Sequence, residues 1–243
     1  MASIGPRPED PAGPAGAAEP FRDDRASPPV RGFLHRPEVP AGRGLVLTHG
    51  AGSSCEAPLL VALSGAFREA GWTVLRCDLP YRQERATGPP RPATAERDRA
   101  GLRSAAAALR GIVPGRTFLG GHSYGGRQAT LAAAEDASLA SALLVLSYPL
   151  HPPRHPERAR TGHLPRLAVP ALFVHGARDP FATIEELREA LRLIPARTGL
   201  LAIEGAGHDL TGRRPAAALA ARIAGEFGTF AGALSAGGGS QGP

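Results

Sequence analysis

The chain has 243 residues, of which 42% are hydrophobic, so it can bury one large core, and a single domain is the default expectation. No apolar stretch approaches the roughly 18 residues of a membrane span, and the N-terminus lacks the basic-then-apolar order of a secretory signal. The net charge of +6 includes 28 basic residues, all arginine and scattered along the chain, which argues against the gathered basic patch of a nucleic-acid binder.

These properties predict a cytoplasmic protein with neither nucleic acid nor a membrane as a partner. The two cysteines, Cys55 and Cys77, match no metal-ligand spacing and are too few for a disulfide framework, which fits a reduced compartment. No phosphate-binding or nucleotide-binding fingerprint occurs, so we expect no cofactor and no metal. A protein partner is compatible with the sequence but is not indicated by it.

The two ends of the chain differ in composition from the middle. Residues 1–28 combine Pro, Gly, Ala and charge without hydrophobic periodicity. Such a segment cannot offset the entropy lost on ordering, so we predict that residues 1–28 are disordered. Residues 233–243, which end in AGGGSQGP, are predicted to be a disordered tail. One domain, residues 29–232, is expected between them.

Within this domain, short apolar runs alternate with longer amphipathic stretches. This pattern predicts an α/β fold in which a mostly parallel central sheet carries helices on both faces. The predicted strands are 44–48, 72–77, 117–120, 143–147, 171–175 and 199–203, and a weaker run at 30–35 is read as an antiparallel edge strand. The predicted helices are about 56–70, 95–112, 124–136, 184–194 and 214–230. The fourth should begin with a capping box formed by Thr183 and Glu186.

The strongest local signal is the run GHSYGG at 121–126, which lies between the strand TFLG and a helical stretch. In a G-x-S-x-G elbow the chain turns so sharply that side chains at the flanking positions would clash, and glycine avoids the clash. The serine then sits at a helix N-terminus, where the helix dipole favours developing negative charge. Taken alone, the run also fits an ordinary glycine-rich turn. Its context favours Ser123 as a nucleophile.

A serine hydroxyl needs a general base, and a histidine base needs an acid that fixes its tautomer. His208 follows the strand at 199–203 in a glycine-bounded loop, and Asp179 follows the strand at 171–175. The chain order Ser123, Asp179, His208 is the order expected when this elbow is part of a hydrolase sheet. We therefore predict these three residues as a catalytic triad.

Other residues compete for these roles. Asp78 and Asp209 are the rival acids. Three other histidines end strands within glycine-flanked loops and are expected to shape backbone instead: His49, His122 and His175. The remaining four have no strand-end context: His35, His151, His155 and His163.

An oxyanion needs hydrogen-bond donors, and two backbone N–H groups are expected to supply them. One belongs to Tyr124, the residue after the predicted nucleophile. The other lies in the loop HGAG at 49–52, which follows the first predicted parallel strand, and is assigned to Ala51.

The order HGAG, GHSYGG, HGARDP, GAGH over about residues 30–230 resembles the α/β-hydrolase superfamily. More narrowly, LTHGAG, GGHSYGGR, SYPLHPP and LFVHGARDPF resemble a small hydrolase-like family that includes a regulatory subunit of the nonspecific lethal histone acetyltransferase complex. Dienelactone hydrolases are a more distant resemblance. By resemblance Ser123, Asp179 and His208 take the triad positions, and Ala51 and Tyr124 the oxyanion positions.

This resemblance implies a serine hydrolase, most nearly a carboxylic ester hydrolase, that acts on a small ester, thioester or related acyl compound. Two alternatives stay open: a hydrolase-fold scaffold or protein-binding module without turnover, and an acyltransferase that uses the same triad. The connection 149–170 contains six prolines, so it predicts a loop and not a helical cap, and hence a shallow, open site. Arg127 and His151 are expected at its rim as substrate-binding residues. The arginines of the connection, together with Arg127, are compatible with an acidic substrate, but a solvated rim is the preferred interpretation.

Overall fold

The computed structural model describes residues 18–211 and 215–236. In this part of the chain one eight-stranded sheet has the order β1-β2-β4-β3-β5-β6-β7-β8. Strands β3 to β8 run parallel to one another, whereas β2 is antiparallel to β4 and β1 is antiparallel to β2. The strands are β1 (Glu19–Asp23), β2 (Val30–His35), β3 (Arg43–Thr48), β4 (Trp72–Cys77), β5 (Arg116–His122), β6 (Leu143–Leu146), β7 (Ala171–Gly176) and β8 (Thr198–Ile203).

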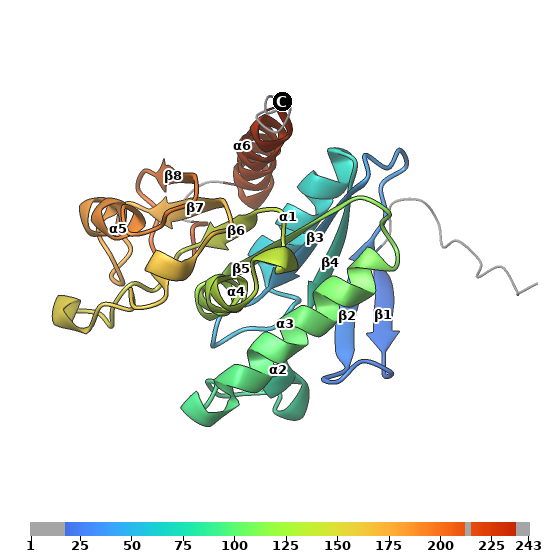
Figure 1. Ribbon diagram of the computed structural model, residues 1–243, viewed down its shortest axis with the longest axis horizontal. Helices are drawn as coiled ribbons and strands as arrows, with labels where there is room; N and C mark the ends of the chain where they lie inside the picture. Colours follow the sequence, from blue (N-terminus) through green and yellow to red (C-terminus); the bar gives the residue numbers. More distant parts are fainter. Residues whose placement is uncertain (1–17, 212–214, 237–243) are drawn as a thin grey trace, which may run out of the picture.

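The helices cover both faces of this sheet (Figure 1). Side chains of α1 and α6 pack into the core on one face, and side chains of α3, α4 and α5 pack into the core on the other. The α-helices are α1 (Pro58–Glu69), α2 (Pro80–Glu84), α3 (Ala95–Arg110), α4 (Tyr124–Glu135), α5 (Ile184–Leu191) and α6 (Ala216–Ala236). The predicted capping box is confirmed, because the Thr183 and Glu186 side chains each accept a hydrogen bond from the other residue's backbone N–H.

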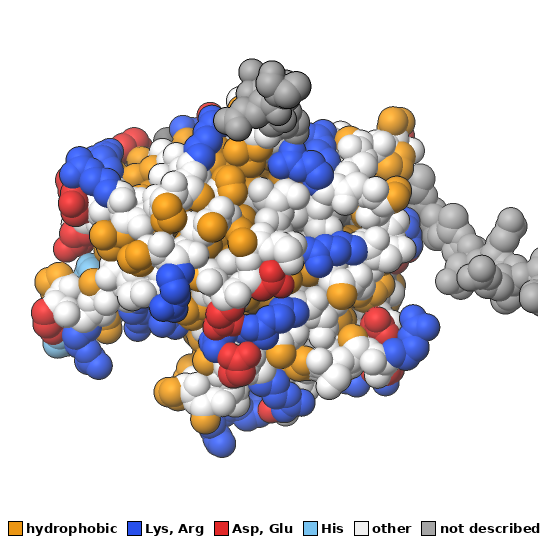
Figure 2. All heavy atoms as spheres, viewed as in Figure 1, with side chains coloured by type: hydrophobic (Ala, Val, Ile, Leu, Met, Phe, Trp, Pro, Cys, Tyr) orange, Lys and Arg blue, Asp and Glu red, His pale blue; other side chains and the backbone are white. Residues whose placement is uncertain are grey.

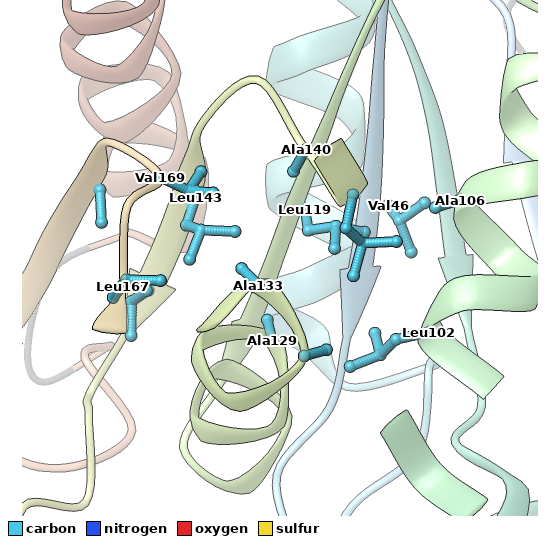
Figure 3. Close-up of a cluster of buried hydrophobic side chains, with 14 of the residues drawn as sticks. Val46, Leu102, Ala106, Leu119, Ala129, Ala133, Ala140, Leu143, Leu167 and Val169 are labelled. Carbon is cyan, nitrogen blue, oxygen red and sulfur yellow. The ribbon is translucent and has the colours of Figure 1, made fainter. Parts of the chain in front are cut away.

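The two cores differ in their side chains. On the α3 and α4 face, Leu102 of α3 and Ala129 of α4 point toward Val46 and Leu119 of the sheet (Figure 3). Because the buried side chains of α4 include small alanines, this helix can pack close to the strands. The opposite face is filled by an aromatic group in which Trp72 contacts the rings of Phe67, Phe118 and Phe227. Tight packing of this kind makes the strand ends a rigid base for side chains in the loops.

The prediction for the N-terminal segment is wrong for residues 18–28. Glu19–Asp23 forms β1, which pairs with residues 30–34 of β2, and Phe21 is half-buried against the core. A five-residue edge strand with one apolar contact has too little periodicity to be read from sequence, and backbone pairing holds it instead. Strand β2 is antiparallel as predicted, but it is not the edge of the sheet. Residues 1–17 lie outside the described residues.

The prediction for the C-terminal tail is wrong at its start, because α6 continues to Ala236. The predicted tail began at residue 233, and its residues 237–243 lie outside the described part of the chain. No helix among the described residues is long and apolar enough to cross a membrane.

The connection between β6 and β7 carries no cap. Between Pro149 and Pro170 it forms two single-turn 3₁₀ helices, Pro156–Arg158 and Leu164–Arg166. On the face shown in Figure 2, the arginines lie in several separate groups with acidic side chains among them, as expected for scattered charge.

Candidate active site

The predicted elbow is formed by β5, Ser123 and α4. Ser123 has φ 51° and ψ −112°, and residues other than glycine rarely adopt a positive φ. Its N–H extends the β5–β6 pairing by donating to the Leu146 carbonyl at 2.7 Å, and its carbonyl accepts from Arg127 N at 2.9 Å in the first turn of α4. The strained serine is therefore held from both sides.

The glycines around Ser123 are required by contacts and not only by backbone freedom. A Cβ on Gly121 would lie 2.6 Å from the Gly125 carbonyl carbon. A Cβ on Gly125 would lie 2.5 Å from the Thr48 hydroxyl at the end of β3. The elbow thus needs small residues because the start of α4 presses directly on the neighbouring strand end.

The structure brings the three predicted triad residues together. His208 Nε2 lies 2.8 Å from Ser123 Oγ, and His208 Nδ1 lies 2.8 Å from Asp179 Oδ2. Because a carboxylate can only accept, the Nδ1–H donates to Asp179, and this tautomer leaves Nε2 free to accept from the Ser123 hydroxyl. The arrangement matches a nucleophile, a base and an orienting acid in geometry.

Contacts other than the one with His208 also hold the Asp179 side chain in place. Its side chain is fully buried, and its second oxygen, Oδ1, accepts from Phe181 N at 2.9 Å. His175 Nε2 lies 3.6 Å from Asp179 Oδ2 and donates instead to the Ala182 carbonyl at 3.0 Å. The Phe181 ring lies 4.3 Å from the His208 ring, centre to centre, and so limits its rotation.

The rival acids lie elsewhere. Asp78 Oδ1 accepts from Cys55 N at 2.7 Å and lies 3.4 Å from His49 Nε2, so it supports the loop after β3. Asp209 lines a pocket together with His49 and has no hydrogen bond to His208 among the described residues. Among the described residues, Asp179 is the carboxylate that bonds His208.

The three other strand-end histidines serve the backbone, as predicted. His122 Nε2 lies 2.7 Å from the His208 carbonyl and thereby braces the loop that carries the base. His49 Nδ1 lies 2.9 Å from the Gly50 carbonyl, and His175 bonds the loop after β7 as described above. Burial lowers the pKa of all three imidazoles, which keeps them neutral.

The loop 49–53, here called the oxyanion loop, docks on the elbow. Gly125 N donates to the His49 carbonyl at 3.1 Å. A Cβ on Gly50 would lie 3.5 Å from Ser123 Cβ, so the loop passes directly beside the nucleophile.

The two predicted donors of the oxyanion site are the N–H groups of Ala51 and Tyr124. Within the described residues, neither group donates a hydrogen bond to another part of the protein. Both sit next to Ser123, one in the docked loop and one at the first residue of α4. They remain the candidate donors to a substrate oxygen.

The structure gives weaker support to Arg127 and His151 as substrate-binding residues at the rim. Arg127 lies one helical turn after Ser123, and its Nε is buried with no hydrogen-bond partner among the described residues. The His151 imidazole has no hydrogen bond to a triad residue among the described residues. It bonds the Pro152 carbonyl at 2.9 Å and Glu186 Oε2 at 3.2 Å, in a pocket of about 350 Å³ between the β6–β7 connection and α5.

A second pocket, of about 330 Å³, adjoins the elbow on the side of the oxyanion loop. Apolar side chains at the start of α1, including Leu59 and Leu60, form one wall, and His122 and Asp209 form another. Sequence reasoning missed this pocket because its two walls come from segments about 150 positions apart in the chain.

Sequence reasoning also missed the side chains that hold the oxyanion loop. Tyr81 and Arg82 of α2 bond its carbonyls, and Asp98 of α3 bonds both Tyr81 and Tyr124. No motif marks these residues, because they act on backbone atoms of distant segments.

Comparison with known proteins identifies the family and the fold. A family model described as an alpha/beta hydrolase domain matches residues 41–224. A dienelactone hydrolase from Anabaena variabilis has a TM-score of 0.70 at 21% sequence identity, over 88% of this chain and 98% of that chain. XC6422 from Xanthomonas campestris, described as a serine hydrolase without a lid, has a TM-score of 0.66 at 18% identity, over 91% of this chain and 98% of that chain.

A serine hydrolase homologue from Coxiella burnetii has a TM-score of 0.69 at 14% identity, over 88% of this chain and 99% of that chain. At these identities the likeness is one of fold, and it confirms the predicted sheet with helices on both faces and no sizeable cap. Since the family model also spans more than half of the sequence, the chain belongs to the alpha/beta hydrolase family.

Proposed function

We propose that the protein is a serine hydrolase that cleaves a small ester, thioester or related acyl compound through an acyl-enzyme intermediate. The observation that carries the proposal is the hydrogen-bonded chain from Ser123 through His208 to Asp179, with both hydrogen bonds at 2.8 Å. A scaffold has no use for a strained serine aligned with a base and a buried acid, whereas nucleophilic catalysis needs all three.

The geometry supports a two-step reaction. In the first step Ser123 Oγ attacks the acyl carbon while His208 Nε2 takes the hydroxyl proton, and the tetrahedral oxyanion is stabilised by the Ala51 and Tyr124 N–H groups. His208 then gives its proton to the leaving group, and the carbon–oxygen or carbon–sulfur bond breaks. In the second step water attacks the acyl-enzyme with His208 again as base, which releases the acid and restores the serine.

The site favours a short acyl group. The pocket beside the elbow holds about 330 Å³ and is lined by Leu59 and Leu60 at the start of α1 but not by the triad residues, so in this proposal it receives only the far end of the acyl group. The β6–β7 connection adds only two single-turn helices, so no cap extends this wall. Each buried methylene contributes about 0.8 kcal/mol of binding free energy, and this gain should end once the pocket is filled.

An acyl-chain series of p-nitrophenyl esters and matched thioesters tests the proposal. We expect kcat/KM to rise over the first few carbons and then level or fall, and Ser123→Ala to remove the activity across the series. A steady rise to long chains would contradict the small site. Absence of turnover on every ester and thioester would contradict the assignment as a hydrolase and favour the scaffold alternative.

A further inference from the structure

The oxyanion loop is held by a tyrosine on α2. The Tyr81 hydroxyl lies 3.1 Å from the Gly50 carbonyl and 3.0 Å from the Ala51 carbonyl, and Tyr81 is only 1% exposed. Its neighbour Arg82 adds hydrogen bonds to the Ala51 carbonyl at 3.1 Å and to the Ser53 carbonyl at 2.8 Å. Three carbonyls of the loop, those of Gly50, Ala51 and Ser53, are therefore bound from the same helix.

These contacts to the carbonyl oxygens fix the direction in which the Ala51 N–H, one of the two candidate oxyanion donors, points. The Gly50 carbonyl and the Ala51 N–H belong to one planar trans peptide unit and point in opposite directions. The Gly50 oxygen accepts from His49 Nδ1 at 2.9 Å and from Ser53 N at 3.2 Å, and it shares the one Tyr81 hydroxyl proton with the Ala51 oxygen. Hydrogen bonds to a carbonyl also polarise its amide, which makes the N–H on the other side a stronger donor.

Asp98 joins this arrangement to the second candidate donor. Its Oδ1 accepts from Tyr81 N at 3.0 Å, and its Oδ2 accepts from the Tyr124 hydroxyl at 2.7 Å. Asp98 is fully buried, and its burial raises the pKa of the carboxyl group. The Tyr81 and Tyr124 rings also meet edge to face with centres 5.7 Å apart. One carboxylate thus ties the residue after the nucleophile to the helix that holds the oxyanion loop.

We propose that Tyr81 and Asp98 are positioning residues that set the mutual placement of the Ala51 and Tyr124 N–H groups. The inference rests on the proposed function, because it concerns the oxyanion site of that reaction. A loop with glycine at positions 50 and 52 has wide backbone freedom, and donors must be aimed in advance to stabilise an oxyanion at full strength. Tyr81 and Asp98 remove this freedom without touching the substrate.

The test compares Tyr81→Phe with Tyr148→Phe. Tyr148 is a matched control, since its buried hydroxyl also donates to a backbone carbonyl, that of Arg160 at 2.7 Å. The readouts are the second-order rate of fluorophosphonate labelling, kcat and KM on a short ester, and the affinity of a trifluoromethyl ketone, which forms a tetrahedral oxyanion adduct on serine. The melting temperature of each variant reports the structural cost.

We expect Tyr81→Phe to lower kcat and the labelling rate about tenfold, to weaken the ketone by a similar factor and to leave KM within about twofold. Tyr148→Phe should lower the melting temperature comparably while keeping the wild-type rates. Equal rates in the two variants would overturn the inference, as would a change confined to KM. Failure of the wild-type protein to be labelled would instead overturn the proposed function.

A double-mutant cycle tests Asp98. In Asp98→Asn the amide oxygen still accepts from Tyr81 N, whereas the amide nitrogen can only donate to the Tyr124 oxygen, which removes the negative charge and reverses the direction of that hydrogen bond. We expect Asp98→Asn and Tyr124→Phe each to lower the labelling rate several-fold and the double variant to be no slower than Asp98→Asn alone. Additive losses would show that the two residues act independently and would contradict the link.

Discussion

Two regions of the molecule build the site in different ways. The candidate triad comes from the loops after β5, β7 and β8, where glycine-bounded turns present Ser123, Asp179 and His208. The candidate oxyanion site comes from the loop after β3 and from the start of α4, and is held by α2 and α3. In the proposed reaction, side chains of the first region act on the substrate. In the second region backbone N–H groups would do so, and side chains would position them.

This difference decides what a sequence can reveal. Nucleophile, base and acid must be particular residue types at strand ends in a fixed order, so they leave a readable pattern. Backbone donors place no demand on their own side chains, and the residues that aim them are chosen by tertiary contact. A side chain such as Tyr81 therefore looks like any other buried aromatic until the packing is known.

The largest effect should come from the acid of the triad. We expect Asp179→Asn to lower kcat/KM by about 10⁴, because the amide favours the wrong tautomer of His208. The matched change is Asp78→Asn in the other region, where the side chain can still accept from Cys55 N. Asp78→Asn should lower kcat/KM by less than tenfold. Steady-state kinetics on one ester checks both, and a reversed ranking would mean that the acid is misassigned.

A smaller effect, on stability and on the labelling rate, is expected at Gly125, where the two regions are in contact. Gly125→Ala would bring a methyl group to 2.5 Å from the Thr48 hydroxyl and 2.6 Å from the His49 carbonyl. Relief of this contact must push the oxyanion loop away from the elbow, at a cost of about 1–3 kcal/mol in the free energy of unfolding, with a loss of labelling rate.

The control for this change is Gly65→Ala in α1, where an added Cβ meets nothing within 4 Å. Alanine favours helix, so we expect Gly65→Ala to be neutral or to stabilise by up to about 1 kcal/mol, with no effect on rate. Chemical denaturation and labelling of both variants provide the measurement. A harmless Gly125→Ala would show that the loop and the elbow are not packed as described.

Much of the fold could be predicted because buried parallel strands and amphipathic helices carry strong periodic signals. The six predicted parallel strands and five predicted helices occur at nearly the expected positions. Strand β1 was missed because it depends on backbone pairing with β2, and α2 because five residues between two loops show no period. Both misses concern segments whose order comes from contacts with distant parts of the chain.

The site shows the same division. Ser123, His208 and Asp179 lie together as the motifs predicted, while His151 lies in a different pocket and bonds Glu186. The β6–β7 connection was expected to line the rim of the site, but it places the His151 imidazole against Glu186 of α5.

The most direct test of the account is covalent labelling of the purified protein with a fluorophosphonate, followed by peptide mapping of the adduct. A fluorophosphonate needs an activated serine, so the label should lie on Ser123 alone and be lost in Ser123→Ala. In His208→Ala the labelling rate should fall by several orders of magnitude, because the triad acts as a unit. An adduct on another residue, or a Ser123→Ala protein that is labelled as fast as the wild type, would contradict the central claim that Ser123 is the nucleophile.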